Sequence, residues 1–74
     1  MQYFRNDTFL KELGKRVRER RKALKLTQAD VAFELNVPTS WVGFVERGQR
    51  NFSVSYLPEL ARVLKLTTSE LVEH

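Results

Sequence analysis

The polar side chains between residues 28 and 50 can form hydrogen bonds, but they do not make a reaction centre. Thr39 and Ser40 carry hydroxyls that donate or accept, and Gln28 carries an amide with donors and an acceptor. Arg47 and Arg50 add guanidinium groups. No nucleophile–base couple, pair of titratable groups or phosphate-cradling glycine loop is present, so the sequence predicts reversible recognition and no enzyme activity.

Two short helices with a tight turn between them must position these groups. Thr27, with Asp30 three residues later, is a capping-box start for the first helix. Asn36 tolerates the left-handed conformation that ends a helix, and Pro38 disfavours helical geometry in the residue before it. The chain therefore turns within residues 36–38.

The second of these helices is expected to open at Thr39 or Ser40 and to close at Gly48. Val42 and Val45, three positions apart, are expected to face inward. The spacing leaves the opposite face to Thr39, Ser40, Gly43 and Phe44.

A helix of this kind fits the major groove of DNA, and the side chains at its N-terminal end reach base edges. Thr39 and Ser40 are therefore the leading base readers. The Thr39 methyl group or the Phe44 ring can touch a thymine methyl, and Gly43 leaves room for close approach. The alternative is that Thr39 and Ser40 only cap the helix.

Length and composition set the class of protein. Seventy-four residues make one small domain, spanning 1–74, with a net charge of +4 and no cysteine. The single His74 has no histidine partner for a metal, and no stretch is long and apolar enough for a membrane span. We therefore expect a cytoplasmic protein without cofactor, metal, small-molecule ligand or membrane contact.

The rest of the chain predicts three more helices and hence an all-α, five-helix bundle. Residues 1–6 are expected to be a loose lead-in, and Asn6 or Asp7 begins a first helix. Its Gly14 predicts close packing of another helix. A fourth helix starts at Ser55, and a capping box from Thr67 to Glu70 opens a fifth.

The pattern of these helices resembles a known family. Its elements are Thr27-Gln28-x-x-Val31-Ala32, Val42-x-x-Val45-Glu46-x-Gly48 and Leu57-x-x-Leu60-Ala61-x-x-Leu64. Together they resemble the helix-turn-helix domain of phage repressors, Cro proteins and their bacterial relatives. Residues 42–51 are most similar to the controller proteins of restriction–modification systems. The resemblance implies a homodimeric transcription regulator, a repressor, an activator or both, on a two-fold symmetric double-stranded DNA operator.

The resemblance also implies roles for single residues. Gln28 would contact the DNA backbone, and Arg50 and Asn51 a phosphate or a base edge. Arg21 and Glu46 would form a structural ion pair across the first and third helices. The chain departs from the family at Pro38, where many relatives carry serine, and at Thr39, where controllers often carry arginine. Because that arginine is missing, recognition has to rely more on thymine methyls, DNA shape, and Arg47 or Arg50.

Further contacts are expected outside this stretch. Trp41, on the flank of the third helix, and Arg16, in a basic run over residues 15–25, are candidate DNA contacts. RNA polymerase is a candidate partner, with Glu34 as the contact. Dimerisation is assigned to the C-terminal side, mainly residues 65–74, through Leu71, Leu66, Val72, Tyr56 and Phe52. The alternative function is an antitoxin-like or other protein–protein module on the same fold.

Overall fold

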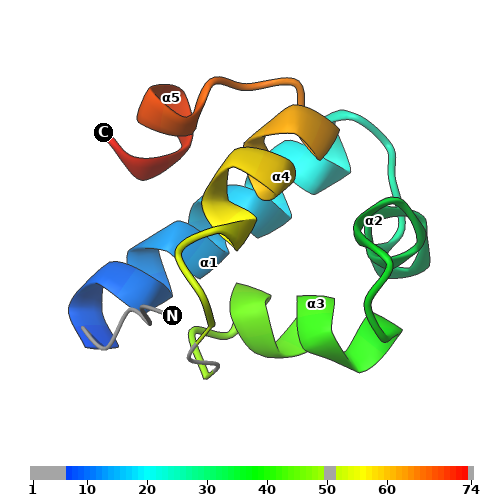
Figure 1. Cartoon of the computed structure of the whole chain (residues 1–74), viewed down its shortest axis with the longest axis horizontal. Helices are drawn as coiled ribbons and strands as arrows, with labels where there is room; N and C mark the ends of the chain where they lie inside the picture. Colours follow the sequence, from blue (N-terminus) through cyan, green and yellow to red (C-terminus); the bar gives the residue numbers. More distant parts are fainter. Residues whose placement is uncertain (1–6, 50–51, 74) are drawn as a thin grey trace.

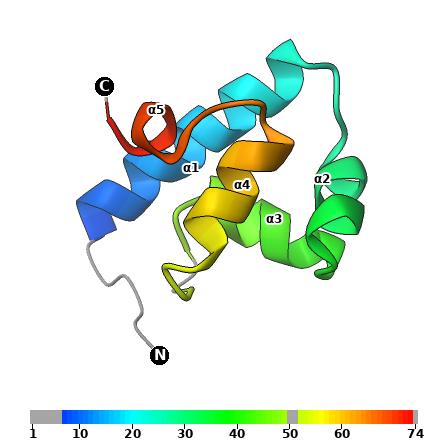
Figure 2. The same ribbon diagram turned by 45° about the horizontal axis from the view of Figure 1, so that its top comes forward.

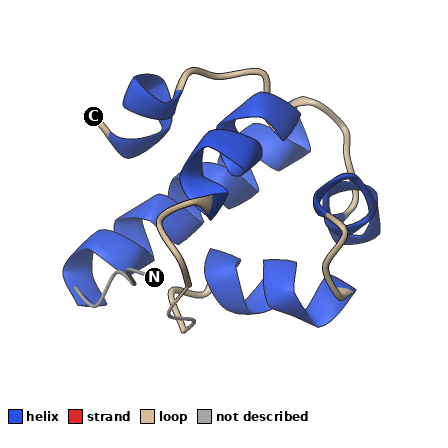
Figure 3. Ribbon diagram, viewed as in Figure 1, coloured by secondary structure: helices blue, strands red, loops and turns tan. Residues whose placement is uncertain are grey.

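The computed structural model describes residues 7–49 and 52–73, and five helices form within them. They are α1 (Asp7–Ala23), α2 (Gln28–Leu35), α3 (Thr39–Glu46), α4 (Tyr56–Val63) and α5 (Thr68–Val72). The predicted all-α, five-helix fold is confirmed (Figures 1 and 3). Residues 1–6, Arg50, Asn51 and His74 lie outside the described residues, and so do the predictions made for them.

One apolar core joins the helices. On α1, Leu10, Leu13 and Val17 are buried, and Val42 and Val45 on α3 are buried as predicted. α1 packs against α3 and α5, and α2 packs against α3 and α4. Figure 2 shows α5 beside α1, well away from α2 and α3. The α2–α3 pair therefore stands at one side of the molecule, where α1 supports it from behind.

Gly14 is the point where α1 and α3 touch. A Cβ atom at this position would lie 2.3 Å from the backbone oxygen of Val45 and 2.6 Å from that of Glu46. These oxygens belong to the last turn of α3. The predicted close packing at Gly14 is confirmed, and it sets how near α3 lies to α1.

The tetrapeptide Leu-Lys-Leu-Thr occurs twice, at 24–27 and 64–67, and forms the same connection each time. Lys25 and Lys65 adopt left-handed conformations, with φ of 60° and 59°, just after α1 and α4 end. Thr27 and Thr67 then begin α2 and α5 as N-caps, and both predicted capping boxes are present.

These capping boxes hold two carboxylates in their charged form. The backbone N–H of Thr27, and then its hydroxyl, keeps the pKa of Asp30 below its ordinary value of 3.8. The backbone N–H of Thr67 does the same for Glu70, whose pKa lies below the ordinary 4.5. A carboxylate with a lowered pKa stabilises the fold above its unfolded pKa, and the effect disappears as the pH falls through the folded pKa.

We therefore expect the caps to contribute fully above about pH 5 and to weaken progressively as the pH falls below about 4 and through the lowered pKa values of the two carboxyls in the folded chain. The combined variant Asp30→Asn, Glu70→Gln should melt below wild type near neutral pH, and this gap should close on acidification. Melting temperatures of both proteins across that range check this. A gap that stays constant down to about pH 3 contradicts it.

Two arginines of α1 bind the C-terminal ends of other helices. Arg16 donates from Nε to the Leu71 oxygen at 2.7 Å and from Nη2 to the Val72 oxygen at 3.2 Å. Arg20, one turn on, donates from Nε to the Leu64 oxygen at 2.9 Å. The last carbonyls of a helix lack partners within it, so these guanidinium groups complete α4 and α5. The guanidinium of Arg16 is therefore held at the end of α5, and the DNA contact assigned to Arg16 stays a prediction.

Two of the five predicted dimer residues belong to the core of the single chain. Leu71 has no exposed surface, and Phe52 is 3% exposed. Leu71 therefore offers a partner no surface and Phe52 almost none, so the structure does not support a dimer contact through these two side chains. Tyr56, Leu66 and Val72 pack at the edge of the core and keep part of their surface open.

Candidate nucleic-acid interface

The N-terminal end of α3 presents two free hydroxyl side chains. Pro38 is the N-cap and makes no side-chain hydrogen bond, so Thr39 and Ser40 are the first two residues of the helix itself. Both are exposed, and neither hydroxyl has a hydrogen-bond partner within residues 7–49 and 52–73. The alternative that these residues cap α3 is thus not what the structure shows. Their hydroxyls are available to an outside partner.

The turn before α3 has the predicted backbone conformation. Asn36 ends α2 in the left-handed conformation, with φ of 58° and ψ of 47°, and its backbone N–H bonds to the carbonyls of Ala32 and Phe33. Pro38 is extended, with φ of −63° and ψ of 147°. In Figure 1, α2 and α3 follow each other across this turn at a marked angle. Beyond this turn, Thr39 and Ser40 are exposed at the outer end of α3.

Arg47 is held in place at the other end of α3. Its guanidinium lies over the Phe44 ring, 5.1 Å from the centroid, and its Nε donates to the Gln49 side-chain oxygen at 2.8 Å. A Cβ at Gly43 would come within 3.2 Å of Arg47 Nη1. Gly43 is buried, contrary to its predicted outward exposure, because Arg47 and Gln28 cover it. The glycine thus makes room for the arginine.

An ion pair fixes the orientation of α3. Arg21 donates from Nε to Glu46 Oε2 at 2.6 Å and from Nη2 to Oε1 at 3.1 Å. The side chains are 10% and 4% exposed. Arg21 also donates to the Leu26 oxygen at 2.8 Å, and Gln28 donates to Glu46 Oε1 at 3.1 Å. The expected pair is present, and it ties α1, the start of α2 and the end of α3 together.

This pair also shapes the charge of the surface. The hydrogen bond from Arg21 to Glu46, above all, raises the pKa of the guanidinium. Glu46 is the only acidic residue in residues 36–49, and Arg21 neutralises it. Arg47, the C-cap residue of α3, is therefore left as an uncompensated positive charge at this end of the helix.

A polar cleft of about 240 Å³ runs between α1, α2 and α3. Some of the residues that line it were not predicted from the sequence. It joins Gln28, Gly43 and Arg47 of the predicted site to Arg18 of α1. Arg18 was only one member of a basic run, and nothing in the sequence distinguished it. Gln49 was missed as well, because its role is to position Arg47. No group of three or more potential metal ligands occurs in the described part of the chain.

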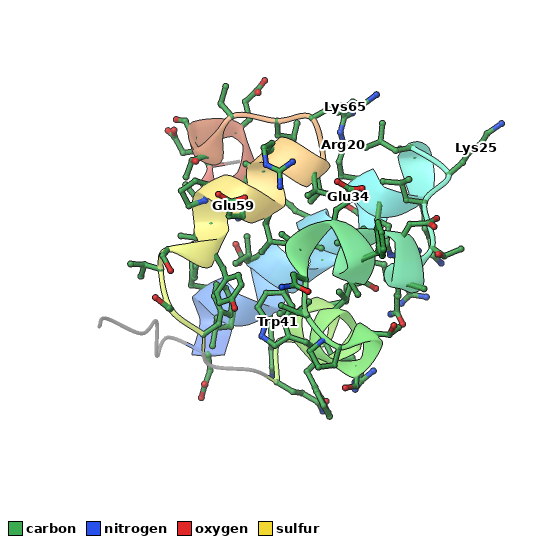
Figure 4. The ribbon with its side chains drawn as sticks, turned by 45° about the vertical axis from the view of Figure 1, so that its right-hand side comes forward. Arg20, Lys25, Glu34, Trp41, Glu59 and Lys65 are labelled. Carbon is green, nitrogen blue, oxygen red and sulfur yellow. The ribbon has the colours of Figure 1, made fainter. Side chains whose placement is uncertain are left out.

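The ring of Trp41 is packed mostly into the core beside this surface. Its side chain is 6% exposed and packs against Phe52 and Tyr56, with ring centroids 5.7 Å and 4.9 Å away. Figure 4 labels it among the packed side chains. α3 turns this ring toward α4, but the indole N–H has no hydrogen-bond partner among the described residues and is not fully buried, so the DNA contact at Trp41 stays a prediction.

The surface can bind a polyanion that carries hydrogen-bonding groups. Hydroxyls stand at one end of α3 and a positioned guanidinium at the other, with Gln28 and Arg18 beside them. Hydroxyls and guanidinium groups pair with base edges and phosphates. No helix of the described residues is long and apolar enough to cross a membrane.

Comparison with known proteins gives a family match over residues 17–71, to the model described as helix-turn-helix. A comparison with curated protein sequences gives no match. Among solved structures, the chain is similar to the restriction–modification controller protein C.AhdI from Aeromonas hydrophila. That likeness has 44% identity over 84% of this chain and 94% of the other, with a TM-score of 0.79.

Two further structures extend the comparison. The DNA-binding domain of BldD is 28% identical over 93% of this chain and all of its own, with a TM-score of 0.79. The controller C.Esp1396I, solved as a tetramer with its natural 35 base-pair operator, is 20% identical over 89% of this chain and 87% of its own. Its TM-score of 0.78 shows a shared fold.

Proposed function

Because this chain belongs to the helix-turn-helix family of DNA-binding transcription regulators and, within it, to the restriction–modification controller proteins, we propose that it binds a two-fold symmetric operator as a homodimer. The N-terminal end of α3 enters the major groove of each half-site. Thr39 and Ser40 contact base edges, and Phe44 meets a thymine methyl. Gln28 and Arg18 contact phosphates on either side of the groove.

The observation that carries this proposal is the combination of exposed and restrained groups on α3. Its first hydroxyls have no partner in the described chain, and its arginine is oriented by Phe44 and Gln49. A guanidinium fixed in this way loses less conformational entropy on binding, and Arg47 is the residue best suited to read guanine or grip a phosphate. Arg50 and Asn51 follow directly in the chain and are proposed to add contacts.

Dimerisation follows from size and from the C-terminal surface. One small module buries too little surface for strong specificity, and two half-sites one helical turn apart supply the rest. Tyr56, Leu66 and Val72 keep open apolar surface near α4 and α5, so we assign the dimer contact to them. In C.Esp1396I, a tetramer binds a 35 base-pair operator. Occupancy of the operator would then follow protein concentration through the monomer–dimer equilibrium.

The proposal also covers where in the cell the regulator works and how it affects transcription. The regulator works in the cytoplasm and acts as a repressor, an activator or both. For activation, Glu34 on α2 is exposed and remains the proposed contact to RNA polymerase. An antitoxin-like module on the same fold is the alternative, and no feature of the site favours it.

Selection from random double-stranded DNA tests the proposal. We expect enrichment of a two-fold symmetric sequence, with half-sites about ten base pairs apart, and an affinity that falls steeply with salt. Each phosphate contact should add about 0.9 to the slope of log affinity against log salt. Recovery of no motif at a low ratio of protein to DNA would instead favour the protein–protein module.

A further inference from the structure

The side chains of Phe44 and Arg47 form one stacked unit on α3. The Arg47 guanidinium lies over the Phe44 ring, 5.1 Å from its centroid, and both side chains are exposed. Phe44 comes four residues after Ser40, so it stands one turn along the same side of the helix. The ring and the guanidinium are therefore presented together toward the partner that Ser40 contacts.

The Arg47 guanidinium has one edge engaged and one edge open. Its Nε donates to the Gln49 side-chain oxygen at 2.8 Å, whereas Nη1 and Nη2 have no hydrogen-bond partner among residues 7–49 and 52–73. Gly43 lies beneath Nη1, where a Cβ would come within 3.2 Å of it. The open edge thus carries two parallel N–H donors, which match the two acceptors that a guanine presents in the major groove.

The stacking of the two side chains resembles one step of the double helix. Successive bases on a strand are about 3.4 Å apart along the axis, so two steps span about 6.8 Å. Because the guanidinium lies over the ring and not beside it, the two groups occupy adjacent layers, and their separation of 5.1 Å falls between one step and two. Groups stacked in this way can contact neighbouring base pairs.

We propose that this unit reads a thymine and a guanine in neighbouring base pairs, with Phe44 on the thymine methyl and Arg47 on the guanine. The inference rests on the proposed function and deepens it. It adds the guanine and makes the methyl group the feature that the Phe44 ring recognises.

A response to DNA methylation follows from this contact. A cytosine methylated at its C5 carbon carries its methyl group at the position that the thymine methyl occupies in the major groove. The unit therefore also accepts a 5-methylcytosine beside a guanine, whereas an unmodified cytosine gives the Phe44 ring no apolar partner. Methylation of cytosine at such a step raises the affinity of the protein for that DNA.

Chemically modified DNA tests the methyl contact, because uracil differs from thymine, and cytosine from 5-methylcytosine, by the methyl group alone. Random-site selection is run on ordinary DNA, on DNA with uracil in place of thymine, and on DNA with 5-methylcytosine in place of cytosine. Ordinary DNA should return a thymine beside a guanine in each half-site. The uracil library should lose this preference, and the methylated library should return 5-methylcytosine as well as thymine there.

The size of the effect is measured on duplexes of the selected sequence. Uracil in place of that thymine should weaken binding about fourfold for each half-site, because one methyl group loses its burial. Phe44→Ala should bind the thymine and uracil duplexes equally, and it should fold, since Phe44 is 38% exposed and outside the core. Thr39→Ala is the control from the same surface and should keep the response to uracil at this position.

Arg47→Lys tests the guanine contact. Lysine keeps the positive charge but lacks the two parallel donors, so the preference for guanine should fall roughly tenfold for each half-site. The dependence of binding on salt should stay unchanged. Gln49 is a positioning residue in this account. Gln49→Ala should weaken the same preference, and Gln49→Glu, which keeps an acceptor for Nε, should retain it.

The outcomes separate this inference from the proposed function. No motif from any library would overturn both. A two-fold symmetric motif that lacks the thymine and guanine, or that binds equally well with uracil, would overturn this inference and leave the operator proposal in place. An Arg47→Lys variant with an unchanged preference for guanine would assign Arg47 to a phosphate and overturn the reading of two neighbouring bases.

Discussion

Replacing Glu46 with alanine is expected to lower the free energy of unfolding by about 3–5 kcal/mol, because it leaves the Arg21 guanidinium without its carboxylate. Arg21 would keep only its hydrogen bond to the Leu26 oxygen, and Gln28 would lose its acceptor. For a chain of this size the loss is a large share of a total stability of roughly 4–11 kcal/mol. Urea denaturation measures it directly.

The same substitution should reduce operator affinity in the molecules that remain folded. The pair ties the end of α3 to α1, and the start of α2 joins it through Gln28, so its loss frees the recognition helix to shift. Glu59→Ala is the matched control, because its pair with Arg62 lies on the surface, with side chains 55% and 58% exposed. That change should cost at most about 1 kcal/mol. If Glu46→Ala and Glu59→Ala lowered the free energy of unfolding and the operator affinity equally, the pair of Glu46 with Arg21 would have no special role in orienting α3.

Replacing Gly14 with alanine is expected to destabilise the fold by about 1–3 kcal/mol or more, although alanine favours helices. The new methyl carbon would lie 2.3 Å from the Val45 oxygen, and a backbone atom cannot rotate out of the way as a side chain can. α1 and α3 would have to move apart. Thermal unfolding and operator binding measure the two consequences.

Gly43→Ala is the control that separates this clash from the loss of a glycine. Its Cβ would meet only the tips of Arg47 and Gln28, at 3.2 Å and 3.7 Å. Those side chains can shift, so Gly43→Ala should keep or raise the melting temperature, given that alanine is favoured by about 1 kcal/mol in a helix. A Gly14→Ala variant as stable as Gly43→Ala would contradict the role given to the helix contact.

Features of local origin were predictable from the sequence. The left-handed Asn36, the two capping boxes and the close contact at Gly14 depend on residues near each other or on the chemistry of one residue. The turn and the outward side of α3 at Thr39 and Ser40 follow from the same local signals. The ion pair of Arg21 and Glu46, in contrast, came from the family resemblance, because spacing along the chain does not reveal it.

Features that depend on distant packing were predicted less well. Apolar periodicity marks Leu71 as facing inward, but it does not say whether its own chain or a partner supplies the contact. Arg16 binds carbonyls more than fifty residues away, and a carbonyl acceptor leaves no trace in the sequence. The exposure of Phe33 was not predicted either. The other apolar residues of α2 already account for the buried side of this helix, so the sequence gives no sign of where the Phe33 ring lies. Only the folded helices show that this ring is left in solvent beside a groove.

The central claim is that the exposed end of α3 reads the operator. Its most direct test is random-site selection, performed in parallel on wild type and on the double variant Thr39→Ala, Ser40→Ala. Both residues are exposed and make no side-chain cap, so the variant should fold normally. We expect wild type to return a two-fold symmetric motif. The variant should lose its base preference at one symmetric pair of positions while it keeps the salt-dependent binding that phosphates supply. An identical motif from both proteins would contradict the claim.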